Sequence, residues 1–203
     1  EIKMKTLFTL IQEDIAIYKN SETISKKDFI HILNPRLHPV ILFRISSWLN
    51  RYHLGVLGKL ISFFNFILFG CDIARKAKID GGLFLPHSSG VVIGEYATIG
   101  KNCIIHQGVT LGDRGEDYED SNPTLGDYVE ICTGAKILGN ITVGKNCKIG
   151  ANSVVVCDVA KNCTAVGVPA KVIKRDKKNE YNLLKLIFGL CRKAMKALTP
   201  IKQ

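Results

Sequence analysis

The 203-residue sequence lacks the features of a secreted disulfide-bonded protein and of a zinc protein. Its seven cysteines are an odd number, which excludes a complete disulfide framework, and their spacing contains no CxxC pair. No secretory signal is recognisable at the start, because acidic residues interrupt its apolar stretch. These absences predict a protein of a reducing compartment, located in the cytoplasm.

The sequence also lacks a long hydrophobic run. The most apolar stretch, Leu60 to Phe69, is about half of the roughly 20 residues that span a bilayer, and Asn65 interrupts it. The formal net charge is +10, which favours an anionic partner such as nucleic acid, a membrane surface or a phosphorylated ligand. No interleaved aromatic and basic residues accompany this charge, so we do not expect nucleic-acid binding.

A period of six residues runs through the chain from Asp72 onward. One column of the repeat is aliphatic at all thirteen of its positions: Ile73, Ile79, Leu85, Ile93, Ile99, Ile105, Leu111, Leu125, Ile131, Ile137, Val143, Ile149 and Val155. Two insertions interrupt the register, one around His87 and one from Asp113 to Pro123. A period of six fits neither an α-helix nor a simple alternating strand.

A second column of small or branched residues lies four positions after the first. Its members are Ala97, Cys103, Val109, Val129, Ala135, Ile141, Cys147, Ser153 and Val159. Each hexad therefore reads as a short strand and a turn, and three hexads close a triangular coil whose aliphatic side chains stack inward. The sequence predicts a mainly β fold, a left-handed parallel β-helix, in which Cys103 and Cys147 are small core residues.

The predicted β-helix has a flanking region on each side. We expect three regions: a helical region at 1–70, the β-helix at 71–175 and a C-terminal helix within 176–203. The apolar spacing predicts N-terminal helices over Lys5–Tyr18, from about Lys26, over Val40–Leu49 and over Leu57–Phe69. The C-terminal helix, Leu183–Leu198, is basic and amphipathic. It is either an ordinary packing helix or a peripheral contact with an anionic membrane surface.

The insertions are where we expect chemistry, because insertions in repeats map to functional loops. His87 lies at the first insertion, and Asp72 precedes it by fifteen residues, nearly one coil, so the two approach each other on adjacent coils. An imidazole oriented by a carboxylate can remove a proton from a hydroxyl. His87 is therefore the predicted general base and Asp72 its partner, while His106 faces outward as a second candidate. The remaining histidines, His31, His38 and His53, are predicted to be structural.

Several short motifs accompany these residues along the chain. They are Glu13-Asp14-Ile15, Leu37-His38, Arg44-Ile45, Asp72-Ile73, His87, Gly90-Val91-Val92-Ile93-Gly94-Glu95, Gly108-Val109-Thr110-Leu111-Gly112, Gly134-Ala135-Lys136-Ile137-Leu138-Gly139 and Gly167-Val168-Pro169-Ala170-Lys171. As a set they resemble the bacterial serine acetyltransferases and the related acetyltransferases that modify surface polysaccharides, such as those of colanic acid.

The resemblance implies an acetyl-CoA-dependent O-acetyltransferase that works as a homotrimer with active sites at subunit interfaces. It implies that the backbone at Thr133 and Ala151, one coil apart, contacts CoA. Lys171 and Lys174 match basic residues near the CoA phosphates, or they are ordinary surface lysines. The acceptor oxygen would attack the thioester directly, with neither a metal nor a covalent intermediate.

Three positions depart from the serine acetyltransferase pattern. Aspartates of that family are replaced by Ser21 and Pro86, and a second active-site histidine is replaced by Asn122. All three would help to hold serine. We therefore predict transfer of the acetyl group to a sugar hydroxyl of a surface polysaccharide or its precursor, with His106 and Asn122 contacting this saccharide acceptor. The alternatives are serine O-acetylation in cysteine biosynthesis and a β-helix scaffold without activity.

Overall fold

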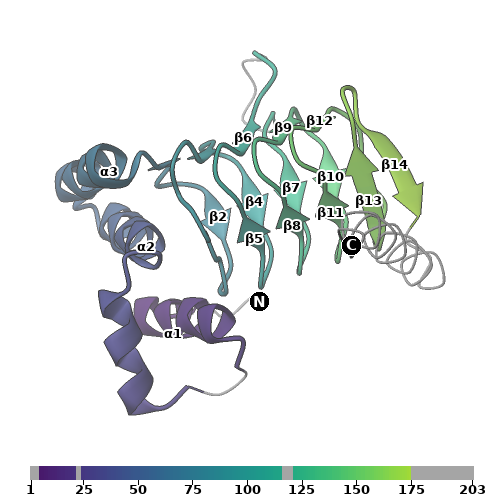
Figure 1. Cartoon of the computed structure of the whole chain (residues 1–203). Helices are drawn as coiled ribbons and strands as arrows, with labels where there is room; N and C mark the ends of the chain where they lie inside the picture. Colours follow the sequence, from purple (N-terminus) through teal and green to yellow (C-terminus); the bar gives the residue numbers. More distant parts are fainter. Residues whose placement is uncertain (1–4, 22–23, 116–120, 175–203) are drawn as a thin grey trace, which may run out of the picture. The chain divides into compact units, whose positions relative to one another are not determined.

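The computed structural model describes residues 5–21, 24–115 and 121–174. A helical N-terminal region is followed by a stack of short parallel strands that form a β-helix (Figure 1). The last helix of this region ends at Phe69, and the first strand begins at Asp72. The predicted helix Leu183–Leu198 lies outside the described residues.

The helical region contains the four predicted helices, one of them a 3-10 helix. They are α1 (Leu7–Lys19), η1 (Lys26–Leu33), α2 (His38–Arg51) and α3 (Gly55–Phe69). Local signals in the sequence explain their ends. Thr6 accepts a hydrogen bond from the Thr9 backbone N–H at the start of α1, and Ser25 forms a capping box with Asp28. Gly70 ends α3 in the left-handed conformation.

The strands form three parallel sheets, because every third hexad of the chain returns to the same side of the prism. The first sheet contains β1 (Asp72–Ile73), β3 (Val92–Ile93), β6 (Thr110–Gly112), β9 (Lys136–Leu138) and β12 (Val154–Val155). The second contains β2 (Lys78–Ile79), β4 (Thr98–Ile99), β7 (Thr124–Leu125) and β10 (Thr142–Val143). The third contains β5 (Ile104–Ile105), β8 (Glu130–Ile131), β11 (Lys148–Ile149), β13 (Cys163–Val166) and β14 (Lys171–Lys174).

Both columns of the hexad repeat form the core of the prism. All thirteen members of the aliphatic column and all nine of the second column are buried. Aliphatic residues stack on their equivalents one coil away, as Ile93 does on Leu111 and Leu111 on Ile137. Burial raises the pKa of the Cys103 thiol to about 11, so this residue is a protonated small core side chain, as predicted.

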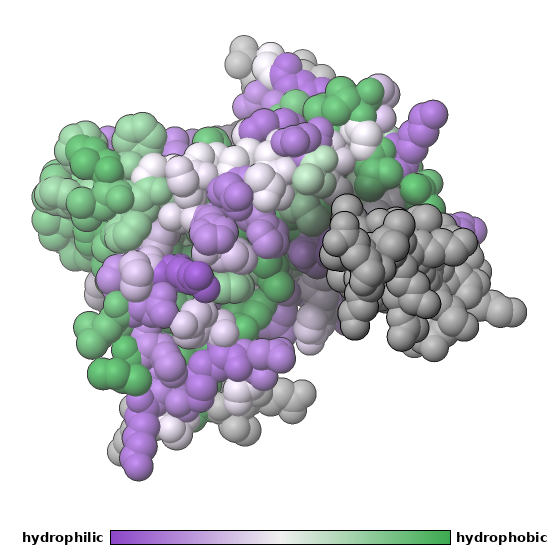
Figure 2. Space-filling model, in the orientation of Figure 1, coloured by the Kyte–Doolittle hydropathy of each residue, from purple (hydrophilic) through white to green (hydrophobic). Residues whose placement is uncertain are grey.

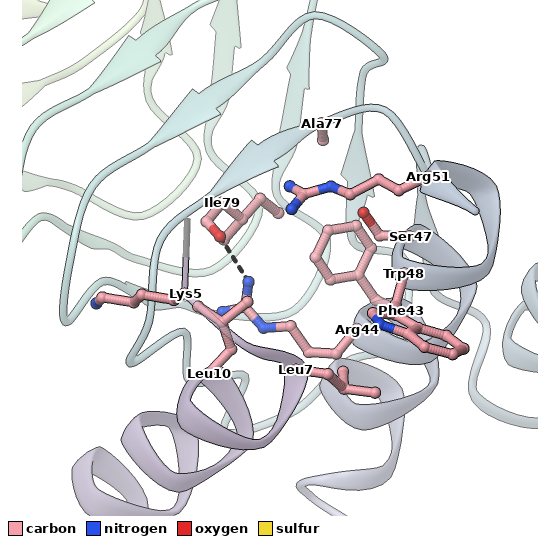
Figure 3. A pocket seen from close by; sticks show the side chains of 10 residues that line it. All are labelled: Lys5, Leu7, Leu10, Phe43, Arg44, Ser47, Trp48, Arg51, Ala77 and Ile79. Carbon is pink, nitrogen blue, oxygen red and sulfur yellow. Dashed lines mark hydrogen bonds between the residues drawn. The ribbon is translucent and has the colours of Figure 1, made fainter. Parts of the chain in front are cut away.

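A buried ion pair ties the helical region to the first coil. Arg44 on α2 donates to both carboxylate oxygens of Asp14 on α1, at 2.9 and 3.0 Å, and the two side chains are 2% and 1% exposed. The Arg44 guanidinium also donates to the backbone carbonyls of Ile79 (2.6 Å) and Asp80 (2.7 Å). Figure 3 shows Arg44 reaching from α2 past α1 toward Ile79 of the coil.

The Asp14 carboxylate completes this junction from the other side. Its Oδ1 atom accepts hydrogen bonds from the backbone N–H groups of Gly82 (2.9 Å) and Leu83 (2.8 Å) in the turn of the first coil. Burial raises the pKa of the Asp14 carboxyl, and Arg44 and the two N–H groups oppose this shift. The pair therefore satisfies polar groups of α1, α2 and the coil together, which fixes the helices on the end of the prism.

Truncation of an inward residue in the middle of the stack should be costly. Leu125 on β7 is 1% exposed and lies between Ile99 and Val143 of the adjacent coils. We expect Leu125→Ala to lower the free energy of unfolding by about 2–5 kcal/mol, because the stack cannot collapse around the cavity. Urea unfolding followed by circular dichroism measures this. Thr124→Ala, at the exposed neighbouring position, should change it by less than about 0.5 kcal/mol; an equal loss in both variants would contradict the expectation.

Candidate active site

The turns that lead from the third sheet to the first stack into one corner of the prism, which we call the His87 corner. It consists of residues 86–91, 106–109, 132–135 and 150–153. Backbone hydrogen bonds connect successive turns, from Gly108 N–H to the Ser89 carbonyl (3.0 Å) and from Gly134 N–H to the Gln107 carbonyl (2.9 Å). The corner thus brings four of the predicted site residues onto one edge: His87, His106, Thr133 and Ala151.

Close packing along this corner requires glycine. Gly108 and Gly134 have φ angles of 69° and 72°, in the left-handed region that side chains disfavour. A Cβ at Gly134 would also lie 2.1 Å from the Oδ1 atom of Asn152 in the next turn. Because these glycines carry no side chain, the backbone itself forms the surface of the corner at their positions.

His87 lies at the first turn of the corner, with its side chain exposed. The two-residue insertion places its segment against the start of β1: Gly90 N–H donates to the Gly70 carbonyl (2.8 Å) and Asp72 N–H to the Val91 carbonyl (2.9 Å). The segment that follows His87 therefore pairs with the strand that carries Asp72. Within the described part of this single chain, neither side chain makes a hydrogen bond or ion pair with another residue.

His106 lies in the same corner as His87, one coil further along the prism. Its Nε2 atom is 3.8 Å from Glu130 Oε1, and Glu130 also pairs with Lys148 at 2.9 Å. The His106 side chain is 28% exposed. His106 thus faces outward, next to a charged cluster on the third sheet.

Thr133 and Ala151 occupy equivalent positions in successive turns of the His87 corner. The Thr133 carbonyl accepts a hydrogen bond from Asn152 N–H (2.8 Å), which links the two turns. The backbone N–H groups of Thr133 and Ala151 donate to none of the residues that the structure describes. Such outward amides, beside glycines without a side chain, fit a ligand that lies along the corner and offers carbonyl oxygens, as pantetheine does.

The two predicted lysines lie at the end of the prism, on strand β14. Lys171 and Lys174 are both exposed. Their ammonium groups lie in solvent, where phosphate groups could reach them. Among the described residues, neither ammonium group has a hydrogen-bond or ion-pair partner.

The structure adds two residues to which the sequence assigned no role. The Lys136 ammonium, on the outward face of β9, donates to the Gly108 carbonyl (2.6 Å) and to the Thr110 hydroxyl (3.0 Å). It therefore brings a positive charge to the His87 corner. The Gln107 side-chain oxygen is buried there without a hydrogen-bond partner among the described residues. The sequence offered one signal for both residues, namely their position next to the predicted turns. Lys136 lies in the motif Gly134–Gly139, and Gln107 directly follows His106.

Asn122 does not join the His87 corner of its own chain. It ends the second insertion, between the first and second sheets, and is 8% exposed. Its Oδ1 atom lies over Gly94, where a Cβ would be only 2.0 Å away, and has no hydrogen-bond partner in the described chain. Asn122 also lines a groove of about 520 Å³ with Lys76, Lys78 and Glu95. A site that combines His87 with Asn122 would need the corners of two chains.

Comparison with known proteins agrees with this architecture. Two family models match, described as bacterial transferase hexapeptide (six repeats) over residues 122–157 and hexapeptide repeat of succinyl-transferase over residues 90–114. The chain is similar to serine acetyltransferase from Helicobacter pylori strain ATCC 700392/26695, with 38% identity over 85% of this chain and 96% of the relative. It is also similar to serine acetyltransferase from Synechococcus elongatus, with 43% identity over 70% of this chain. This match spans 58% of the relative's own length.

Solved structures give the same result. A serine acetyltransferase in complex with CoA superimposes with a TM-score of 0.73 and 34% identity, covering 82% of this chain and 69% of that one. The Neisseria gonorrhoeae serine acetyltransferase in complex with serine has a TM-score of 0.73 and 37% identity, covering 81% of this chain and 68% of that one. The predicted left-handed β-helix is thereby confirmed.

These comparisons overturn one prediction. The relatives and structures named here are serine acetyltransferases, so our prediction of a polysaccharide-modifying enzyme was wrong. It rested on three missing side chains, at Ser21, Pro86 and Asn122. A side chain missing at one position does not exclude a substrate, because backbone groups and other side chains of a folded site can hold the same groups. Identity over nearly the whole length of a relative outweighs those three positions, and the chain belongs to the serine acetyltransferase family of hexapeptide-repeat transferases.

Proposed function

We propose that this protein is a serine O-acetyltransferase, which transfers the acetyl group of acetyl-CoA to the hydroxyl of L-serine. The observation that carries the proposal is the 38% identity to a serine acetyltransferase over 96% of that relative's length. The His87 corner supports it, because it offers an exposed imidazole beside a backbone surface that suits an extended thioester. O-Acetylserine is a precursor of cysteine, which would place the reaction in cysteine biosynthesis.

His87 is proposed as the general base. An imidazole nitrogen takes the proton of the serine hydroxyl as its oxygen attacks the thioester carbonyl. The C–S bond then breaks, and the same proton passes from His87 to the departing CoA sulfur, so that the imidazole ends the cycle neutral. Asp72, on the adjacent coil, would orient the ring and stabilise its charged form once the substrates close the site.

CoA is proposed to lie along the His87 corner. The outward N–H groups of Thr133 and Ala151 would bind the pantetheine amides, and the exposed Lys171 and Lys174 would bind its phosphates. Lys136, which reaches the Gly108 carbonyl, would add positive charge next to the reacting carbonyl. We also propose a homotrimer with active sites at the subunit interfaces, as the resemblance to the family implies.

Steady-state assays with purified full-length protein test the function. With acetyl-CoA and L-serine we expect O-acetyl-L-serine by mass spectrometry, and turnover on the order of 1–1000 per second, the usual range for enzymes. L-Alanine, which has no hydroxyl, and D-serine are the matched control acceptors and should give no product above background. Acetyl-CoA binding without O-acetylation of L-serine would refute the proposed acceptor.

A further inference from the structure

Helix α3 has an inverted distribution of polar and apolar side chains. Its buried positions are Gly58 and Asn65, while the Ser62 hydroxyl oxygen is also buried. Its outward face consists of large apolar side chains that are 51–82% exposed: Val56, Leu57, Phe63, Phe66, Ile67 and Leu68. A helix that packs on a globular core in water normally shows the opposite pattern.

The inverted pattern is stabilised by close contacts with α2. A Cβ at Gly58 would lie 2.9 Å from the Ser46 carbonyl oxygen of α2, so only glycine allows this approach. The Asn65 side-chain amide donates to the Pro39 carbonyl at 3.0 Å. Small residues and polar side chains between helices, with apolar side chains outside, are the arrangement that helices adopt in an apolar solvent.

The outward face of α3 forms a continuous apolar surface. Figure 2 shows it as a green patch at the side of the molecule where Figure 1 places α3. Exposure of this many large apolar side chains in one place marks an interaction surface, because covering them removes a large apolar area from water.

The charge around this patch indicates what covers it. From Phe29 to Cys71 the sequence contains no aspartate or glutamate. The exposed cationic residues in this segment are Arg36, Arg51 and Lys59. Near the end of α2, the rings of Trp48 and Tyr52 lie at 46° to each other with centroids 4.8 Å apart, and the two residues are 39% and 63% exposed. Such an aromatic pair, with basic residues beside it, is typical of helices at a lipid–water interface.

We propose that α3 docks this protein onto an anionic phospholipid surface, with its apolar face inserted among the lipids and its basic neighbours on the headgroups. Among the described residues, no helix is long and apolar enough to cross a membrane. With 15 residues, α3 would therefore lie in the plane of the surface. A second copy of the chain is a weaker occupant, because its α3 region would bring the same positive charge to the contact.

Vesicle flotation of the full chain tests the proposal. We expect the wild type to float with vesicles of phosphatidylcholine and phosphatidylglycerol and to bind pure phosphatidylcholine more weakly. The double variant Phe63→Gln/Phe66→Gln should lose at least about tenfold in vesicle binding, because two inserted aromatic side chains are removed. Leu33→Gln is the matched control: Leu33 is 72% exposed on η1, outside α3, and its replacement should leave binding unchanged. Lys59→Glu should weaken binding to the anionic vesicles alone.

Three results would overturn the proposal. In the first, the wild type stays in the unbound fraction with anionic vesicles. In the second, the double variant binds as well as the wild type, so that another segment makes the contact. In the third, sedimentation velocity shows a smaller assembly for the double variant, which would make this face a contact between subunits. L-Serine turnover by each variant in the absence of lipid checks that the fold is intact.

Discussion

Replacement of His87 with alanine is expected to lower kcat for L-serine by about 10²–10⁴-fold, the usual contribution of a general base. The side chain lies on the outer edge of the prism and makes no hydrogen bond with the other described residues, so its removal should leave the fold unchanged. Acetyl-CoA binding, measured by isothermal titration calorimetry, should also change little, because the proposed CoA contacts lie on other turns. The loss should therefore appear in kcat, with KM for acetyl-CoA nearly constant.

A control histidine separates this effect from the removal of any imidazole. His53 is exposed in the turn between α2 and α3, with a φ angle of 60° that asparagine adopts readily. His53→Asn should keep wild-type kcat. If His87→Ala kept more than about a tenth of wild-type kcat, His87 would not be the base, and His106 in the same corner would be the next candidate.

Asp72→Asn distinguishes a positioning role from a merely structural one. Loss of this carboxylate should lower kcat for L-serine, since the imidazolium proposed to form during the reaction loses a stabilising charge. The loss should be smaller than in His87→Ala, with KM for acetyl-CoA and the free energy of unfolding nearly constant. A kcat equal to that of the wild type would show that Asp72 does not act on the proposed base.

Replacement of Asp14 with alanine is expected to cost about 3–5 kcal/mol of stability, because Arg44 would remain buried without its counter-charge. The same change also leaves the backbone N–H groups of Gly82 and Leu83 without their acceptor. The free energy of unfolding from urea titration, followed by circular dichroism, measures the loss. We expect the helical region to be destabilised most, because Asp14 lies at its junction with the coil.

Two variants complete this experiment. Glu95→Ala removes one partner of the Lys76–Glu95 pair, whose side chains are 62% and 44% exposed, and should cost no more than about 1 kcal/mol. The double variant Asp14→Ala/Arg44→Leu should recover part of the loss, since it removes the unpaired charge as well. A similar cost for Asp14→Ala and Glu95→Ala would contradict a structural role for the buried pair.

Much of the fold could be predicted from local sequence. In a β-helix each hexad buries its aliphatic residue against the hexads one coil away, so the period alone predicts thirteen core positions, the strands and the corner turns. The helices were predictable for a similar reason, since apolar spacing and caps act within a few residues. The insertion also predicted that His87 would stand outside the stacked core.

Contacts between segments that are far apart in the sequence could not be predicted in the same way. The Asp14–Arg44 pair joins residues thirty positions apart, and neither local motif predicts that the two side chains contact each other. Lys136 reaches the His87 corner across 28 residues, and Asn122 belongs to a different corner from His87 in the same chain. The prediction of a saccharide acceptor was wrong because it rested on single replaced side chains, whose effect depends on the rest of the folded site.

The sequence by itself therefore determined the hexad prism and the place of His87 on its edge, because both depend on short-range periodicity and its interruption. The tertiary structure decided which side chains share that edge, how the helical region is fastened to the first coil and which face of α3 is exposed. These features depend on packing between elements that are far apart in the chain, where burial of one group changes the environment of another.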